Sequence, residues 1–492
     1  MKEKIQKIIE SRFGNKIVEF CNSVWYIVAI GCVCVFAHSL NLPVVGAVLL
    51  SLLLIPALLF CKNTFVLVPF LMMCSFVMSL ETEPSSGHYN NPAYIAILCI
   101  LLVCIVFALV FNIVYYEHWR KIYKRLYLSF SFAILTAAVL FGGVGSSTFS
   151  WVGMGMTVAI AATMFLPYAL LVNCGEYKGQ KTVEYFAWSV IVAALVIIAA
   201  FFRQYAIHGF DTDVGAVKGF LKLGYVGPNT GAAIITLSIP MTFYFVYKYK
   251  RGCLFLLLVA FELFAVIASY SRASFVVAFP GTVIVAIALC FKKKTGRKGY
   301  FIAFGVAVAA ALVILIVLRR PIFAMIETLF KGNTTGSGRT DLWKDGFEAW
   351  KRYPIAGVGL WYLTINGHWY YSFHCTPLTY LYCYGIIGLA AYLYHRYKTV
   401  RLVFAAKLTP ERVFVALTVL AMLCNALLDI AMTSPTHLLY YGIMLALLDC
   451  DVRKTKSEAS TTGEVLQTDA SPSAESIIND VNSNTIQESN NE

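Results

Sequence analysis

The chain has 492 residues, of which 59% are hydrophobic and only 13% are charged. A soluble core cannot hold so many apolar residues, so the composition excludes an ordinary soluble domain and indicates a protein of the lipid bilayer. The formal net charge of +13 would suggest nucleic acid for a soluble protein. Here the cations fall in short loops between apolar segments, so membrane topology explains them and no nucleic-acid partner is expected.

Apolar segments long enough to cross ~30 Å of hydrocarbon recur along the chain. We therefore predict an all-α polytopic membrane protein with about 14 transmembrane helices. The predicted spans are residues 18–38, 42–60, 64–80, 93–116, 127–145, 151–172, 185–204, 229–247, 252–270, 274–291, 299–318, 375–394, 412–431 and 435–450. The first follows a basic N-terminus without a small-residue cleavage site, which favours a retained span over a signal peptide.

The same pattern divides the chain into parts of different character. They are a cytoplasmic N-terminus (1–17), a transmembrane bundle (18–318), a long extracytoplasmic loop (319–374), C-terminal transmembrane helices (375–450) and a tail (451–492). The tail is rich in Ser, Thr, Asn, Glu and Asp and is expected to be disordered and cytoplasmic.

Lysine and arginine predict the orientation, because cytoplasmic loops collect them. Both termini are expected in the cytoplasm, and the run HRYKTVR at 395–401 is assigned to a cytoplasmic loop. Eleven cations remain on the outer side, in the 203–228 loop, at the turn Ser271–Arg272 and in the 319–374 loop. A positive charge on that side indicates that an anionic group is bound there.

The sequence gives little support for a metal or a disulfide framework. The 14 cysteines lie mostly inside spans and form no CxxC pair, so we interpret them as packing residues. Asp211 and Asp213 are the only close pair of outer carboxylates, and no third acidic or histidine ligand lies near them in the sequence. We expect neither a metal nor a cofactor.

The segment from Gly336 to Gly388 combines polar and apolar residues, and we interpret it as the centre of an active site. Its first part, RTDLWKDGFEAWKRYP, has aromatic residues at helical spacing, with Thr340 as a possible N-cap and Pro354 as a stop. Arg339 at the entrance to this amphipathic helix is suited to bind phosphate with its side chain. In the alternative interpretation, these cations only form the solvated face of the helix.

Two further residues on the outer side carry the functional interpretation. Arg272, in SYSRASF, stands in a short connection near the membrane boundary, where it either binds an anion or extends to lipid headgroups. His374, in YYSFHCTPL, lies where the long loop re-enters the membrane and is the residue best able to take a proton near neutral pH. The alternative for His374 is an interfacial histidine in an aromatic neighbourhood.

Three weaker candidates for substrate binding lie near the outer ends of spans: Arg203, Asn229 in GYVGPNTGA, and Asp429 in NALLDIAM. A carboxylate in such a place is uncommon, so Asp429 is predicted to pair with an arginine or to orient His374. It could equally be a plain boundary residue.

The segments SGRTDLW, YPIAGVGL and FHCTPLTYLYCYGIIGLAAYLYH, in this order, resemble the signature loop of the O-antigen ligase and polymerase superfamily. The upstream segments GPNTGAA and SYSRASF are also similar to that family. The resemblance covers about 229–394 for the motifs. One departure is Cys375, because the family usually has Asn directly after the loop histidine.

The resemblance implies a GT-C-like organisation and a membrane glycosyltransferase of the bacterial inner or cytoplasmic membrane. Its donor would be a polyprenyl-pyrophosphate-linked glycan, and its acceptor a sugar hydroxyl on a glycan or lipid-glycan. Arg272 and Arg339, with Arg203 assisting, would hold the pyrophosphate, and His374 would activate the acceptor for inversion without metal or nucleotide. The ligase and polymerase activities share these motifs.

The competing hypothesis is a lipid-linked glycan flippase or another transporter. Transporters place ionisable groups near the bilayer midplane and are often built from repeated halves. The sequence shows no convincing internal repeat, and its span interiors are interpreted as free of charge, so transfer chemistry is favoured.

Overall fold

The computed structural model describes residues 2–77, 91–121, 126–147, 149–209, 214–221, 226–292, 297–317, 319–320, 323, 339–360, 362–363, 369–370, 373–429 and 434–469. These residues are almost all helical. Turns join the helices, and the strands within the described residues form one antiparallel pair, β1 (Tyr362–Leu363) and β2 (Trp369–Tyr370), with Tyr362 opposite Tyr370.

The first half of the chain contains α1 (Lys2–Ile9), α2 (Arg12–Cys21), α3 (Val24–Leu40), α4 (Pro43–Phe60), α5 (Val68–Met73), α7 (Pro92–Tyr115), α8 (Ser129–Leu140), α9 (Trp151–Cys174), α10 (Gln180–His208) and α11 (Val214–Phe220). The second half contains α12 (Pro228–Lys248), α13 (Phe255–Ala268), α14 (Arg272–Lys292), α15 (Arg297–Val317), α17 (Arg339–Arg352), α18 (Thr376–Val403), α19 (Pro410–Leu428) and α20 (Pro435–Asp469). Short 3₁₀ helices are η1 (Thr64–Leu67), η2 (Cys74–Phe76), η3 (His118–Lys121) and η4 (Gly252–Leu254).

Each predicted span contains a helix, which confirms the all-helical membrane class. Within the described ranges, seven helices are long and apolar enough to cross a membrane, and the pair α2 and α3, bent by 70°, adds an eighth if it forms one span. Others are shorter: Ser129–Leu140 would extend only ~18 Å at ~1.5 Å per residue. The count of about 14 therefore stays a prediction.

Three details differ from the sequence interpretation. The run 395–401 is part of α18 and not a loop, because the helix continues to Val403. Helix α20 runs on to Asp469, so the start of the predicted disordered tail is helical. Helix α17 begins at Arg339, so Thr340 lies inside the helix and not at its N-cap.

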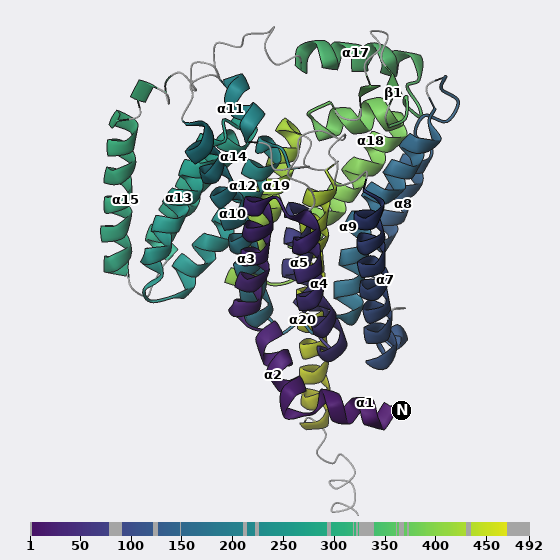
Figure 1. The fold of residues 1–492 in the computed structure, drawn as a ribbon, viewed down its shortest axis with the longest axis vertical. Coiled ribbons are helices and arrows are strands. Elements are labelled where there is room, and N and C mark those ends of the chain that lie inside the picture. Colours follow the sequence, from purple (N-terminus) through teal and green to yellow (C-terminus); the bar gives the residue numbers. More distant parts are fainter. Residues whose placement is uncertain are drawn as a thin grey trace, which may run out of the picture.

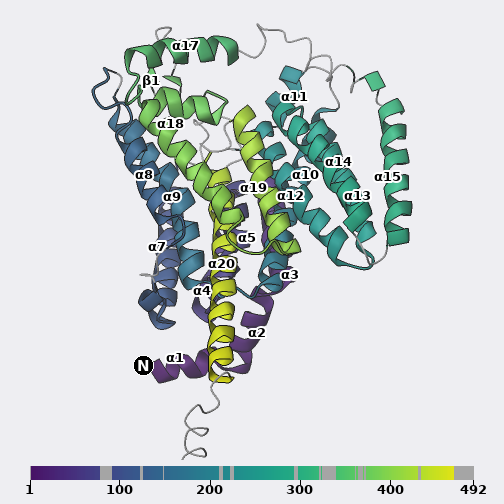
Figure 2. The ribbon, with the colours of Figure 1, turned by 180° about the vertical axis from the view of Figure 1, so that it is seen from behind.

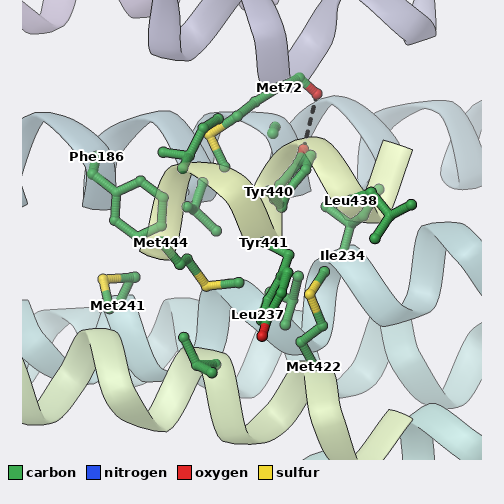
Figure 3. Packing of buried hydrophobic residues seen from close by; sticks show 14 of the residues in the cluster. Met72, Phe186, Ile234, Leu237, Met241, Met422, Leu438, Tyr440, Tyr441 and Met444 are labelled. Carbon is green, nitrogen blue, oxygen red and sulfur yellow. Dashed lines mark hydrogen bonds between the residues drawn. The ribbon is translucent and has the colours of Figure 1, made fainter. Parts of the chain in front are cut away.

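Helix α12 is the most enclosed of the membrane-spanning helices, with 89% of its apolar window buried. Its small and β-branched residues allow α10, α13, α14 and α19 to pack around it. Figure 3 shows the adjoining core, where side chains of α5, α10, α12, α19 and α20 interdigitate. There Tyr440 donates a hydrogen bond to the Met72 carbonyl at 2.9 Å, so its hydroxyl is satisfied inside the apolar core.

The N-terminus and the last turns of α20 lie at one end of the bundle, and α17 lies across the other (Figures 1 and 2). We call these the N-terminal end and the His374 end. Helix α15 stands at the edge of the bundle in both views. Most site residues predicted from the sequence fall at the His374 end.

Arg412 ties three helices together at the N-terminal end. Its guanidinium, with no exposed side-chain surface, binds Asp451 at 2.7 Å and the Val403 carbonyl at 2.8 Å. It also donates to the carbonyls of Leu402 and Leu448. These bonds join the end of α18, the start of α19 and the middle of α20.

We expect Arg412→Ala to lower the free energy of unfolding by ~3–5 kcal/mol, because it leaves a carboxylate and several carbonyls without their donor. The measurement is the thermal unfolding midpoint of the detergent-solubilised protein. Arg401→Ala serves as the control, since Arg401 is exposed. Equal midpoints for the two variants would contradict the structural role of Arg412.

A break in α18 shapes the His374 end. Gly385 adopts φ +66° and ψ −165°, and the helix changes direction there. The segment after α17 pairs with this break: the Gly359 N–H donates to the Cys383 carbonyl at 2.8 Å, and the Ile386 N–H donates to the Pro354 carbonyl at 2.9 Å. Backbone hydrogen bonds thus join the motifs YPIAGVGL and YGIIGL. We call this contact the backbone joint.

Candidate functional site

His374 and Asp429 form a hydrogen-bonded pair at the His374 end. The imidazole Nδ1 lies 2.9 Å from the Asp429 Oδ1, and the side chains are 40% and 10% exposed, respectively. Because an ionised carboxylate only accepts hydrogen bonds, Nδ1 carries the hydrogen in this contact. A neutral His374 ring would then have its lone pair on Nε2, which is the arrangement a general base requires.

Helix α17 fixes the backbone just before His374. The Trp343 indole N–H donates to the Phe373 carbonyl at 2.6 Å, and the Phe373 N–H donates to the Thr379 hydroxyl at 3.2 Å. Gly346 allows the close approach, because a Cβ there would lie 2.4 Å from the Tyr382 ring. His374 itself has φ +49°, a left-handed backbone that a histidine adopts only when its surroundings hold it.

Asp429 is held at the end of α19. Its N–H closes the last helical turn on the Asn425 carbonyl at 2.8 Å, and its own carbonyl accepts from the Thr376 hydroxyl at 3.4 Å. Thr376 is the first residue of α18 and stands two positions after His374. Both members of the pair are therefore fixed where α18 begins and α19 ends.

Arg272 is the first residue of α14, beside the same end of α19. The Ser274 hydroxyl donates to the Asn425 side chain at 3.3 Å, one turn before Asp429. Ser271 in turn donates to Ser274 at 3.1 Å. Within the part of the chain that the structure describes, no hydrogen bond or ion pair engages the Arg272 guanidinium.

The weaker candidates occupy neighbouring helix ends. Arg203, near the end of α10, donates to the Ser39 carbonyl at 3.0 Å, so one of its N–H groups is used by the end of α3. Asn229 is the second residue of α12, and its buried side-chain oxygen has no partner among the described residues. Helix α12 contacts both α14 and α19, which places Asn229 on the helix that supports the site.

For Arg339 the structure gives the backbone position only. It begins α17, one turn before Trp343, so it lies ~6 Å along the helix from the anchor on Phe373. Asp211 and Asp213 lie outside the described residues. Within the described residues no group of three or more His, Cys, Asp and Glu side chains is arranged to hold a metal ion.

The structure adds residues that the sequence analysis did not select. Asn425 and Thr376 are buried and position the pair, and Trp343 anchors α17 on it. Spacing could have indicated Asn425, since it precedes Asp429 by four residues and shares its helix face. Thr376 and Trp343 carried no such signal, because their contacts depend on how the long loop folds back.

The fold and the site define a multi-helix membrane protein with a histidine–carboxylate pair at one end of its bundle. Residues 253–393 match the family model of O-antigen ligase. This region includes Arg272, Arg339 and His374, whereas Asp429 lies beyond it. No curated protein matches the chain.

The resemblance to the O-antigen ligase and polymerase superfamily is therefore confirmed. The matched region supports a membrane enzyme of the O-antigen ligase or polymerase type.

Proposed function

We propose that the protein transfers a glycan from a polyprenyl-diphosphate carrier to an acceptor hydroxyl at the His374 end, on the extracytoplasmic face. The observation that carries this proposal is the 2.9 Å bond between His374 and Asp429. His374 takes the proton of the attacking hydroxyl, and Asp429 orients the ring and offsets the positive charge that it gains. The hydroxyl oxygen attacks the anomeric carbon with inversion, and the carrier diphosphate leaves.

Arginines supply the positive charge that the departing diphosphate needs. Arg272 is suited to this role, because it begins α14 beside the α19 end that holds Asp429 and its guanidinium has no protein partner among the described residues. Arg339 adds a second cation at the start of α17. Arg203 and Asn229 are assigned to binding of the donor from the neighbouring helices.

Purified protein in liposomes, given a polyprenyl-diphosphate oligosaccharide, tests this proposal. We expect a glycan ladder if the enzyme polymerises its substrate, or a single transferred unit if a foreign lipid-glycan acceptor is required. Arg272→Gln is expected to raise the KM for the donor and to lower kcat, because one diphosphate contact is lost. Lys344→Gln is the control for general loss of positive charge, since Lys344 is exposed on α17. Equal rates for Arg272→Gln and the wild type would remove Arg272 from the donor site.

One buried ionisable residue favours the competing transport hypothesis and corrects the view that span interiors are free of charge. Glu262 of α13 is 0% exposed and accepts hydrogen bonds from Ser238 at 2.7 Å and Thr242 at 3.0 Å. Ionisable groups inside a span are typical of transporters. Arg396, which lies just beyond the predicted span 375–394, is only partly buried between the rings of Tyr392 and Tyr441, at 4.7 Å from each centroid.

The bonds of Glu262 also have a purely structural explanation, because they fasten α13 to α12. The liposome experiment separates the two functions. Movement of the intact donor across the bilayer without a new glycosidic bond would support transport, and Glu262→Gln would then reduce it. Product formed at equal rates by Glu262→Gln and the wild type would support transfer chemistry.

A further inference from the structure

Glu262 is the only ionisable residue of the apolar helix α13, and the proposed transfer reaction does not use it. It lies in the middle of the helix and is 0% exposed. Its Oε1 contacts the Ser238 hydroxyl at 2.7 Å and the Thr242 hydroxyl at 3.0 Å, both on α12. Its Oε2 is buried and has no hydrogen-bond partner within the described residues.

No positive charge lies against this carboxyl in the part of the chain that the structure describes. Besides burial, the two hydroxyls of α12 are what acts on it. The charged residues of the four helices that pack on α13 lie toward the helix ends, away from their centres. They are Lys181, Glu184 and Arg203 on α10, Lys248 on α12, Arg272 and Lys292 on α14, and Arg297 and Lys298 on α15. Lys248 is also paired with Glu184.

A carboxylate in this position would be costly. Burial without a cation removes the hydration of the charge and returns nothing for it, and one of the two carboxylate oxygens would have no donor at all. A buried acid without a partner cation therefore takes up a proton and becomes neutral. The burial and the contacts of Glu262 favour the neutral acid.

The hydrogens of the two hydroxyls lead to the same conclusion. Ser238 Oγ also lies 2.7 Å from the Ile235 carbonyl oxygen, and Thr242 Oγ1 lies 3.2 Å from the Ser238 carbonyl oxygen. Each hydroxyl has one hydrogen, so an ionised carboxylate would leave two hydrogens for four contacts. A proton on Oε1 supplies a third hydrogen. Glu262 then donates to Ser238 Oγ, and the Ser238 hydrogen bonds the Ile235 carbonyl.

We propose that Glu262 is a proton-binding site: in the folded protein at about pH 7 it is a neutral carboxylic acid that donates its hydrogen to Ser238. The bound proton joins α13 to α12 without placing a charge in the apolar core. A glutamate that meets water ionises near pH ~4.3, so Glu262 releases its proton only where water reaches it. Because the carboxyl is fully buried, such access requires α12 and α13 to separate.

Infrared difference spectra of the full-length protein test this proposal, because a protonated carboxyl has a carbonyl stretch that a carboxylate lacks. The spectra are recorded at about pH 7 in a detergent without ester or carboxyl groups, since lipid esters absorb in the same region. Glu262→Gln is expected to remove acid intensity equal to one carboxyl per molecule. Glu348→Gln is the control, because Glu348 is exposed and paired with Lys351 at 2.8 Å, and it is expected to leave the acid band unchanged.

A second variant tests the contact with α12 and decides the matter if Glu262→Gln does not accumulate. Ser238→Ala is expected to shift the acid band without removing it, because the acid loses its acceptor and stays buried. Ser131→Ala replaces another buried hydroxyl, which contacts His395 on α18, and is expected to leave the band in place.

Two results would overturn the proposal. One is the loss of carboxylate bands in Glu262→Gln while the acid band keeps its intensity, which would show that Glu262 is ionised. The other is an acid band that Ser238→Ala does not shift. Because these spectra need no substrate, they are independent of the glycan-transfer assay, and failure of the proposed function would leave this inference standing.

Discussion

Replacing His374 by asparagine is expected to lower the rate of glycan transfer by ~10²–10⁴-fold, the usual effect of removing a positioned general base. Asparagine is preferred to alanine here, because His374 has φ +49° and asparagine tolerates a left-handed backbone. Its amide can still contact Asp429 but cannot take a proton. The variant therefore removes the chemistry and preserves the local fold.

The measurement is the initial rate of product formation in liposomes at saturating donor. His208→Asn is the matched control, because His208 is an exposed histidine that ends α10. Its rate is expected to equal that of the wild type. His374→Ala is also expected to lose glycan transfer. Asp429→Asn is expected to lower the transfer rate less than either His374 variant. Product at the wild-type rate from His374→Asn would remove His374 as the base.

The second large effect is expected from Gly385→Ala. Gly385 has φ +66° and ψ −165°, a conformation essentially restricted to glycine, and a Cβ there would lie 2.0 Å from the Ile355 carbonyl oxygen. Backbone strain and the overlap together are expected to cost ~2–6 kcal/mol. To relieve this overlap, the segment 354–359 must move away from Gly385 in α18. The first residues of α18 would then move as well.

Thermal unfolding midpoints and transfer rates are measured together for this variant. Gly281→Ala is the control, because Gly281 lies in α14 and a Cβ there has no atom within 4 Å. Alanine is a better helix former, so this control is expected to be neutral or more stable by ~0.5–1 kcal/mol. If Gly385→Ala unfolds at the wild-type temperature and keeps the wild-type rate, the backbone joint does not position the site.

The sequence predicted the helices well, because apolar length is a local property. The predicted spans 42–60 and 229–247 agree with α4 and α12 to within a residue or two. Sequence could not predict how many helices cross the membrane. Helix α8 is short. Helix α18 is broken at Gly385, and this break depends on contacts with the segment 354–359, which sequence does not reveal.

The catalytic and binding roles of the candidate residues stay predictions, and the sequence selected only some of the side chains that the structure brings together, since it missed Asn425, Thr376 and Trp343. His374 and Asp429 were selected separately, and their pairing was one of three options for Asp429, because sequence does not show which helix ends meet. The bond to Ser39 at the end of α3 could not be predicted for Arg203.

Hydrogen bonds fix both ends of the loop between Leu360 and Phe373. Gly359 is bonded to Cys383 before it, Phe373 is bonded to Thr379 after it, and β1 pairs with β2 within it. Lengthening such a closed loop costs little, about 0.6 kcal/mol per doubling. Insertions in this loop are therefore expected to cost little stability and to leave the backbone on either side of it, including that of His374, in place.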